Sequence, residues 1–334
     1  MSLTSMLEGL KKNEKQFQAI IKKVTPNRND FQTMSGNVAF SNEYDMLVPY
    51  SLENPYNSKI LGIAFDYMAR LMIARIATNN REAFFTELAA EKGLDKIKLR
   101  RGEEDNISIK LENLYNKAVN LMRDFVEGGS DIQMMIRVSN FLAKLELVYR
   151  NNKLPEDILK SLFSHPSEDI ARELEQMCKV FEDKFCIPEI IHKESEVVYN
   201  PNFGLASMMV DGADGDIIID GVLYDFKTRK PFAYSWVNAA QLIGYYFLNE
   251  ISLTARDLGY EGSSFNIEKV ALYKARYGEI EYFDLKNTDA EKNAEITEEL
   301  ILHFEENCFT IRSLNAFVPT FLQEYKSIVE SIKG

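Results

Sequence analysis

One stretch constrains the fold of this chain more than any other: residues 211–228, which read DGADGDIIIDGVLYDFKT. It holds two short apolar runs, at 217–219 and 222–224, with Asp220-Gly221 between them. An Asp-Gly pair between two such runs is typical of a tight turn that joins paired strands. The stretch therefore predicts a β-hairpin.

The hairpin gathers charged side chains at one end. Successive side chains of a strand point to opposite faces, so Asp225 and Lys227 share one face, while Phe226 points to the opposite, buried face. Asp216 directly precedes the first strand. Because the turn pairs the two strands, it brings Asp216 near Asp225. The pattern predicts two carboxylates and one ammonium group side by side.

These residue types suit a divalent metal ion. Mg²⁺ prefers oxygen ligands and usually takes one or two protein carboxylates, keeping its other positions for water and substrate phosphate oxygens. Asp216 and Asp225 supply that number, and the backbone carbonyl of Phe226 is a candidate third ligand. Lys227 would lie beside a metal-bound water, where an ammonium group can orient the nucleophile or share the developing charge. The chemistry predicted is phosphodiester hydrolysis that depends on Mg²⁺ or Mn²⁺.

The spacing of Asp216, Asp225 and Lys227 resembles the pattern of the PD-(D/E)XK nuclease superfamily, in which these residues lie on adjacent strands. Members of the exonuclease-like branch carry a Gln and a Tyr on the next helix, and Gln241 and Tyr245 stand at matching places. The resemblance implies a restriction-endonuclease-like core, Gln241 as a residue that orients the attacking water, and DNA as the substrate. It leaves open whether the enzyme is an exonuclease or an endonuclease.

Two further acids are candidate metal ligands. Asp214 is a rival of Asp216, because Gly-Ala-Asp-x-Asp resembles the lead-in of some bacterial and phage members of the superfamily. Asp216 is preferred, since it directly precedes the apolar strand. Glu173 lies on a helix predicted at about 168–185, where relatives often place an acid. The alternative for Glu173 is a solvated helix face.

Asp66 lies on a helix predicted at 58–78, which is apolar nearly all round. The favoured interpretation is an intrahelical ion pair with Arg70, four residues further on. The alternative is a resemblance to the Gly-x-x-x-acid helix that flanks the metal site of related nucleases, with Gly62 allowing close packing.

The formal net charge of −12 excludes a uniformly basic nucleic-acid-binding surface, because phosphate binding needs clustered Lys and Arg. Any such surface must be local. Arg229 and Lys230 follow the motif closely, and with Tyr245 they are the candidate nucleic-acid-binding residues. The basic run at 96–101 is more typical of a charge-balanced surface loop.

We expect an α/β fold with a mixed central sheet flanked by helices. A largely helical N-terminal module would span residues 1–154 and a nuclease-like domain residues 155–334, with the helix at 58–78 able to pack on the core. Further strands are predicted near 190–199, 205–210, 270–273 and 280–283, and further helices near 81–92, 107–126, 131–150 and 156–164.

Cysteine content and hydropathy indicate the cellular compartment of the protein. The three cysteines form no CxxC pair, which fits a reducing environment. The chain has no run of 18 apolar residues, and its N-terminus lacks the apolar core of a signal peptide. We therefore expect a soluble, cytoplasmic protein with no membrane partner. The nucleic-acid partner is what the resemblance implies. The oligomeric state stays open.

Two other classes of function are compatible with the sequence. A nuclease-fold module without catalysis could bind nucleic acid or a protein partner, because a fold can persist after its activity is lost. A helical scaffold with an acidic surface could recruit a basic partner, in which case the hairpin would be purely structural.

Overall fold

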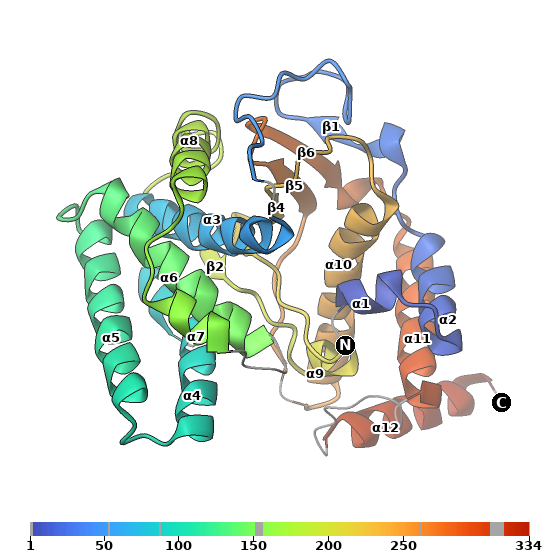
Figure 1. The fold of residues 1–334 in the computed structure, drawn as a ribbon. Helices are drawn as coiled ribbons and strands as arrows, with labels where there is room; N and C mark the ends of the chain where they lie inside the picture. Colours follow the sequence, from blue (N-terminus) through green and yellow to red (C-terminus); the bar gives the residue numbers. More distant parts are fainter. Residues whose placement is uncertain are drawn as a thin grey trace.

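A mixed β-sheet forms the centre of the molecule (Figure 1). The computed structural model describes residues 3–52, 54–86, 88–150, 156–260, 262–307 and 317–333. In this part of the chain, six strands form one sheet in the order β1-β6-β5-β4-β3-β2, and only β4 and β5 pair in parallel. The strands are β1 Gln32–Thr33, β2 Val197–Tyr199, β3 Ile217–Ile219, β4 Val222–Lys227, β5 Lys269–Lys274 and β6 Glu279–Asp284. The expected α/β class with a mixed sheet flanked by helices is confirmed.

The predicted hairpin is formed by β3 and β4. Ile217 pairs with Tyr224, and the turn between the strands consists of Asp220 at φ 46° and Gly221 at φ 80°. Positive φ at both turn residues is what a type I′ turn requires, and Asp-Gly is among the pairs that adopt it most readily. The turn therefore sets the strand register that the site depends on.

Helices cover both faces of the sheet. They are α1 Leu3–Glu8, α2 Lys12–Lys22, α3 Pro55–Ile76, α4 Ala89–Arg101, α5 Asn106–Val126, α6 Ile132–Arg150, α7 Glu156–Leu162, α8 Glu168–Lys184, α9 Gly204–Met209, α10 Trp236–Asp257, α11 Ala290–Asn307 and α12 Phe317–Lys333. Phe226 and Tyr273 lie in the hydrophobic cluster that contains α3 and α8, while Leu223 and Leu272 lie in the cluster that contains α10. The two clusters follow the alternation of side chains along the strands.

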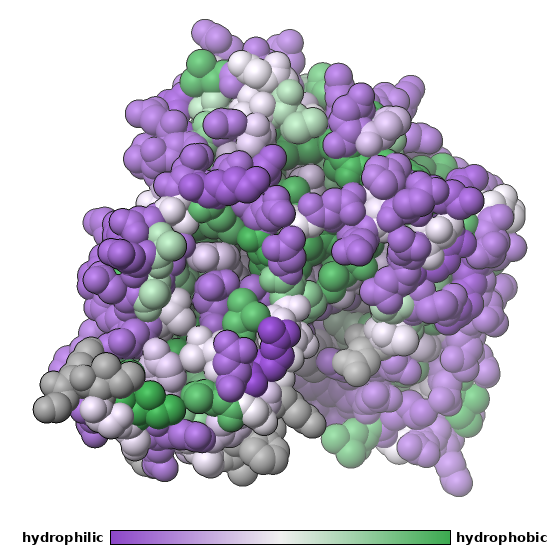
Figure 2. Space-filling model, turned by 180° about the vertical axis from the view of Figure 1, so that it is seen from behind, coloured by the Kyte–Doolittle hydropathy of each residue, from purple (hydrophilic) through white to green (hydrophobic). Residues whose placement is uncertain are grey.

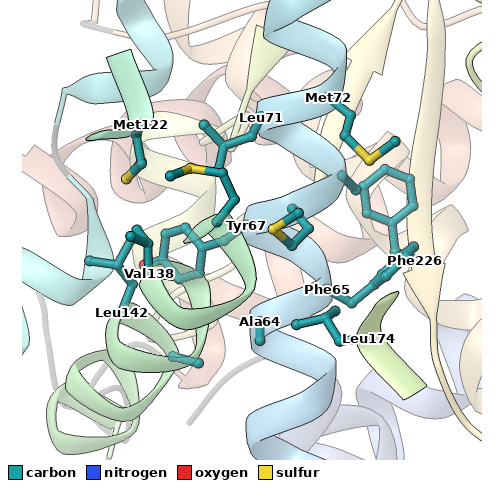
Figure 3. Packing of buried hydrophobic residues seen from close by; sticks show 14 of the residues in the cluster. Ala64, Phe65, Tyr67, Leu71, Met72, Met122, Val138, Leu142, Leu174 and Phe226 are labelled. Atoms are coloured by element: carbon teal, nitrogen blue, oxygen red, sulfur yellow. The ribbon is translucent and has the colours of Figure 1, made fainter. Parts of the chain in front are cut away.

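The helix α3 is buried on two sides (Figure 3). Phe65 packs edge-on against Phe226 of β4, with ring centres 6.0 Å apart. Tyr67 lies on the other side of the helix, toward Val138 and Leu142 of α6. Apolar residues around most of the circumference suit such an interior position. α3 thus joins the sheet to an outer layer of helices formed by α4, α5 and α6 (Figure 1).

The first outer helix differs from the prediction. The segment predicted as a helix at 81–92 is a short 3₁₀ helix, Arg81–Phe85, and α4 begins only at Ala89. The basic run at 96–101, predicted as a loop, forms the last turns of α4. There Lys98 pairs with Glu112 of α5 over 2.8 Å. Cations are favoured at a helix C-terminus, so this charge pattern fits a helix end better than a loop.

Two strand predictions were also wrong in part. Residues 205–210 were predicted as a strand, but residues 204–209 form α9, with Leu205 and Met209 buried on one side of the helix. Of the strand predicted near 190–199, only 197–199 is extended in β2. A short apolar run does not distinguish a strand from a buried helical turn, and here the tertiary packing selects the helix.

The two regions expected from the sequence share their hydrophobic packing. α1 and α2 lie beside α10 and α11 in one cluster, although they are near opposite ends of the chain (Figure 1). α3 packs on the sheet in the other cluster. The predicted boundary at 154/155 touches residues 151–155, which lie outside the described residues, and the division stays a prediction.

The surface is mainly hydrophilic on the face shown in Figure 2, with hydrophobic side chains visible mostly in its recesses. Among the described helices, none is long and apolar enough to cross a membrane.

Candidate functional site

Asp216 and Asp225 stand opposite each other at the open end of the β3–β4 hairpin. Ile217 pairs with Tyr224, so the register continued by one residue sets the two carboxylates face to face. The backbone N–H of Phe226 donates to Asp216 Oδ2 over 2.6 Å. In an extended strand the N–H and C=O of one residue point to the same side, so the Phe226 carbonyl also faces the side of Asp216. The three predicted metal ligands are therefore neighbours.

A line of polar contacts runs from Asp225 to α10. Lys227 Nζ lies 2.5 Å from Asp225 Oδ2 and donates to Gln241 Oε1 over 3.1 Å. Gln241 Nε2 in turn donates to the hydroxyl of Tyr245 over 2.9 Å. Ser235 caps α10, its Oγ accepting from the backbone N–H of Asn238, and so fixes where the helix starts. The structure thus joins four of the predicted residues in one line of contacts: Asp225, Lys227, Gln241 and Tyr245.

The electrostatics of the carboxylate pair fit a divalent cation. Burial and then the charge of Asp225 raise the pKa of Asp216 to about 6, although Phe226 N–H, Arg70 and Lys227 act in the opposite direction. Asp225 Oδ2 is buried and accepts no hydrogen bond from any described residue, since its contact with Lys227 is an ion pair without hydrogen-bond geometry. Two like charges in a low-dielectric site are stabilised by a bound cation. Within the described residues, no group of three His, Cys, Asp or Glu is placed to hold a metal. Asp216, Asp225 and the Phe226 carbonyl stay candidate ligands.

Asp66 approaches the pair from α3. Burial and then the charge of Asp216 raise its pKa well above the usual range, and Arg70 opposes this shift. A Cβ atom at Gly62 would lie 3.3 Å from Thr228 Oγ1, just beyond Lys227, so the glycine permits the close approach of α3 to the strand end. This geometry fits the alternative in which Gly62 and Asp66 flank the site.

The favoured ion pair between Asp66 and Arg70 was wrong. In the described part of the chain no salt bridge joins the two side chains. Arg70 Nε donates to the backbone carbonyl of Asp66 over 3.0 Å, and its Nη1 donates to Asn200 Oδ1. The prediction considered only neighbours on the helix, whereas Asn200 lies 130 residues away in the chain.

These groups line one pocket of about 770 Å³. Asp66, Asp216 and Asp225 lie in it with Lys227, and the exposed residues Lys59, Arg229 and Lys230 add positive charge to its wall. The other lining residues are Tyr50, Pro55, Ser58, Leu61, Gly62, Ile63, Leu147, Arg150, Phe226, Thr228, Pro231 and Arg276. The pocket thus combines acidic residues with a partly basic wall in a chain of net negative charge.

Two candidate acids lie outside this pocket. Glu173 is 1% exposed, which overturns the solvated helix face. Its Oε1 accepts from the backbone N–H and the hydroxyl of Ser51, both over 2.6 Å, and its Oε2 accepts from Arg276. Both oxygens of Glu173 therefore already have donors. Asp214 is exposed and accepts from Asn202 over 2.7 Å, so Asp216, rather than Asp214, is the acid that lines the pocket.

The candidate nucleic-acid-binding residues divide into two kinds. Arg229 and Lys230 are exposed and line the pocket. Tyr245 is 5% exposed, and its ring stacks on Phe203 with centres 5.8 Å apart. Tyr245 therefore holds Gln241 from inside the protein, whereas Arg229 and Lys230 are free to meet a ligand.

Several pocket residues were not singled out from the sequence. Tyr50 stands in a segment that carries no motif, Lys59 is an ordinary cation near the start of α3, and Arg276 is another just after β5. Arg70, a charged residue on the largely apolar α3, does not line the pocket; it was assigned to Asp66 alone and donates to Asn200 instead. The shared position of the pocket residues depends on how α3 docks on the end of β4, and the Gly62-x-x-x-Asp66 pattern was the local signal for that docking.

Comparisons of the chain with protein-family models, with curated proteins and with solved structures found no significant match.

Proposed function

We propose that this protein is a metal-dependent nuclease with a restriction-endonuclease-like core, acting on phosphodiester bonds in DNA. The observation that carries the proposal is the register of the hairpin, which sets Asp216 opposite Asp225 with Lys227 Nζ 2.5 Å from Asp225. Two carboxylates and an ammonium group in one pocket are the groups that metal-assisted phosphate hydrolysis needs.

Each pocket residue has a distinct role in the proposed hydrolysis. Asp216, Asp225 and the Phe226 carbonyl would hold Mg²⁺ or Mn²⁺. The bound ion would supply a more acidic water and charge stabilisation on the attacked phosphate. Lys227, half-buried beside Asp225, donates to the attacking water or to the developing negative charge. Arg229 and Lys230 hold neighbouring phosphates of the substrate strand.

Gln241 acts through Lys227 in this mechanism. Its Oε1 accepts from Lys227 Nζ and its Nε2 donates to Tyr245, so both ends of the amide already have partners. It is a positioning residue that keeps the ammonium group in place, and the role suggested by the resemblance, orientation of the water, is exercised indirectly.

The test is cleavage of labelled linear, circular and single-stranded DNA with Mg²⁺, Mn²⁺ or EDTA. We expect metal-dependent cutting by the wild-type protein and a loss of at least about a hundredfold in Lys227→Ala. Lys286→Ala is the matched control, because Lys286 is an exposed lysine at the far end of the sheet, paired with Glu268. Circular dichroism establishes that each variant is folded. Absence of cutting by folded wild-type protein, or equal cutting by Lys227→Ala, would overturn the proposal.

One observation favours a second candidate, a nuclease-fold module that binds without cutting. The ammonium group of Lys227 lies so close to Asp225 that it already neutralises one of the two carboxylates. A site neutralised in this way has less need of a metal ion. Stoichiometric DNA binding by folded wild-type protein, without turnover in either metal, would identify this candidate.

A further inference from the structure

Tyr50 presents an aromatic ring in the wall of the pocket. It is one of the lining residues, and the residue is 38% exposed. The guanidinium carbon of Arg276 lies 4.8 Å from the centre of the ring, and Arg276 itself is fully buried. The cation therefore covers the inner side of the ring. The Tyr50 hydroxyl shares a hydrogen bond with Ser58 Oγ over 2.8 Å, which further fixes the ring.

Three cations accompany this ring. Lys59, Arg229 and Lys230 are exposed, line the same pocket, and take part in no ion pair within the described residues. An open aromatic face combined with a basic groove is how proteins bind single-stranded nucleic acid, with bases stacked on the rings and phosphates on the cations.

The recessed carboxylates argue for the same kind of ligand. Asp225 is only 4% exposed, and the pocket of about 770 Å³ has the size of a small-molecule site. A double helix is too large to enter such a space, and its paired bases offer no free face to an aromatic ring. An unpaired strand can enter and stack.

We propose that the pocket selects single-stranded nucleic acid, with an unpaired base stacked on Tyr50 and the adjoining phosphates held by Lys59, Arg229 and Lys230. The inference rests on the proposed function in one respect, that the phosphate beyond the stacked base lies at Asp216 and Asp225.

The test measures binding without cleavage. Fluorescence anisotropy in EDTA would measure the affinity of the protein for a labelled single strand of mixed sequence and for the matching blunt duplex. We expect wild-type protein to bind the single strand at least about tenfold more tightly. Tyr50→Ala should weaken that binding about 5- to 150-fold, the range for loss of one base–aromatic stack, whereas Tyr50→Phe should retain it.

A matched control is available in Tyr149. It is 45% exposed and lies under a cation, with Lys92 Nζ 5.8 Å from its ring centre, but it does not line the pocket. Tyr149→Ala should bind like wild type. Lys59→Ala tests the pocket without disturbing the packing of Tyr50, and it should weaken binding and reduce its salt dependence.

Two results would overturn the inference: blunt duplex bound as tightly as single strand, or Tyr50→Ala and Lys59→Ala both indistinguishable from Tyr149→Ala. The cleavage assay keeps the two proposals apart. Tyr50-dependent binding of single strands by a protein that cuts nothing would uphold this inference and reject the nuclease. Metal-dependent cutting of covalently closed duplex DNA, as fast as that of single strands and unchanged in Tyr50→Ala, would uphold the nuclease and reject this inference.

Discussion

Lys227 Nζ donates to Gln241 Oε1 over 3.1 Å, which ties the end of β4 to the second turn of α10. The position of the Lys227 ammonium group therefore depends on the helix α10 as well as on its own strand, β4.

Gln241→Leu tests this dependence. The substitution keeps the approximate size of the side chain and removes the acceptor for Lys227, so we expect DNA cleavage to fall about 10- to 100-fold with the fold retained. Tyr245→Phe, which removes only the acceptor of Gln241, should have a smaller effect in the same direction. Steady-state cleavage rates check both variants, and an unchanged rate in Gln241→Leu would contradict the positioning role.

Metal binding should be visible as stabilisation. An ion present at 100 times its Kd adds about 2.7 kcal/mol to the free energy of unfolding. We expect Mn²⁺ to raise the melting temperature of wild-type protein and to have little effect on Asp225→Asn, which lacks one ligand. Asp214→Asn is the control, because that acid is two residues from Asp216 and exposed outside the pocket. Equal metal-induced shifts in Asp225→Asn and wild type would reject the assigned ligands.

A buried acid away from the site gives the stability a pH dependence. Glu281 is fully buried, accepts from the Phe40 N–H over 2.6 Å, and lies 3.6 Å from Lys274 Nζ. Burial raises its pKa from 4.5 to about 7, although Lys274 and the Phe40 N–H lower it. Between these two pH values the folded state holds a proton that the unfolded state has lost, so the contribution of Glu281 to stability decreases as the pH rises from about 4.5 to 7.

Glu281→Gln should remove the part of this dependence that Glu281 contributes and leave the parts of Asp66 and Asp216, whose pKa values burial also raises. The share of Glu281 over the window is on the order of 3 kcal/mol, and the amide does not titrate. Urea denaturation at several pH values between 4.5 and 7 measures the slope. If the variant retained the full wild-type slope, another group would be responsible.

Gly93 marks a close approach between α4 and α6. A Cβ atom there would lie 1.9 Å from the backbone oxygen of Leu145, so the helices would have to move apart. Gly93→Ala should therefore destabilise the protein by about 1–3 kcal/mol, the usual cost of overpacking, despite the better helix propensity of Ala. Gly62→Ala, whose Cβ would meet only Thr228 Oγ1 at 3.3 Å, should have a smaller effect. Thermal or urea denaturation of the two variants compares them directly.

The sequence predicted the hairpin and the position of Asp216, Asp225 and Lys227 because short-range rules determine them. Asp220-Gly221 selects the turn, and the alternation of a strand then decides which side chains meet. Gln241 and Tyr245 came from a resemblance, and their contacts follow the expected chain of residues.

The rest depends on contacts between distant segments. Arg70 donates to Asn200 and Glu173 accepts from Arg276, pairs separated by 130 and 103 residues. For both predictions the available partners were neighbours in the helix, so Arg70 was assigned a local ion pair, and Glu173 was a candidate metal-site acid with a solvated helix face as the alternative. α9 was misread for the related reason that its few apolar residues fit either periodicity, and only the packing of Leu205 and Met209 decides between them.

The two-sided burial of α3 limits how this chain can be divided. A fragment that begins after Ile76 would lack the helix that covers one face of the sheet. A fragment that retained α3 without α4, α5 and α6 would expose the side that carries Tyr67 and Leu71 to water. The helices α4, α5 and α6 therefore cannot be removed or exchanged as an independent unit. A relative without them would need other apolar residues to bury the outer side of α3.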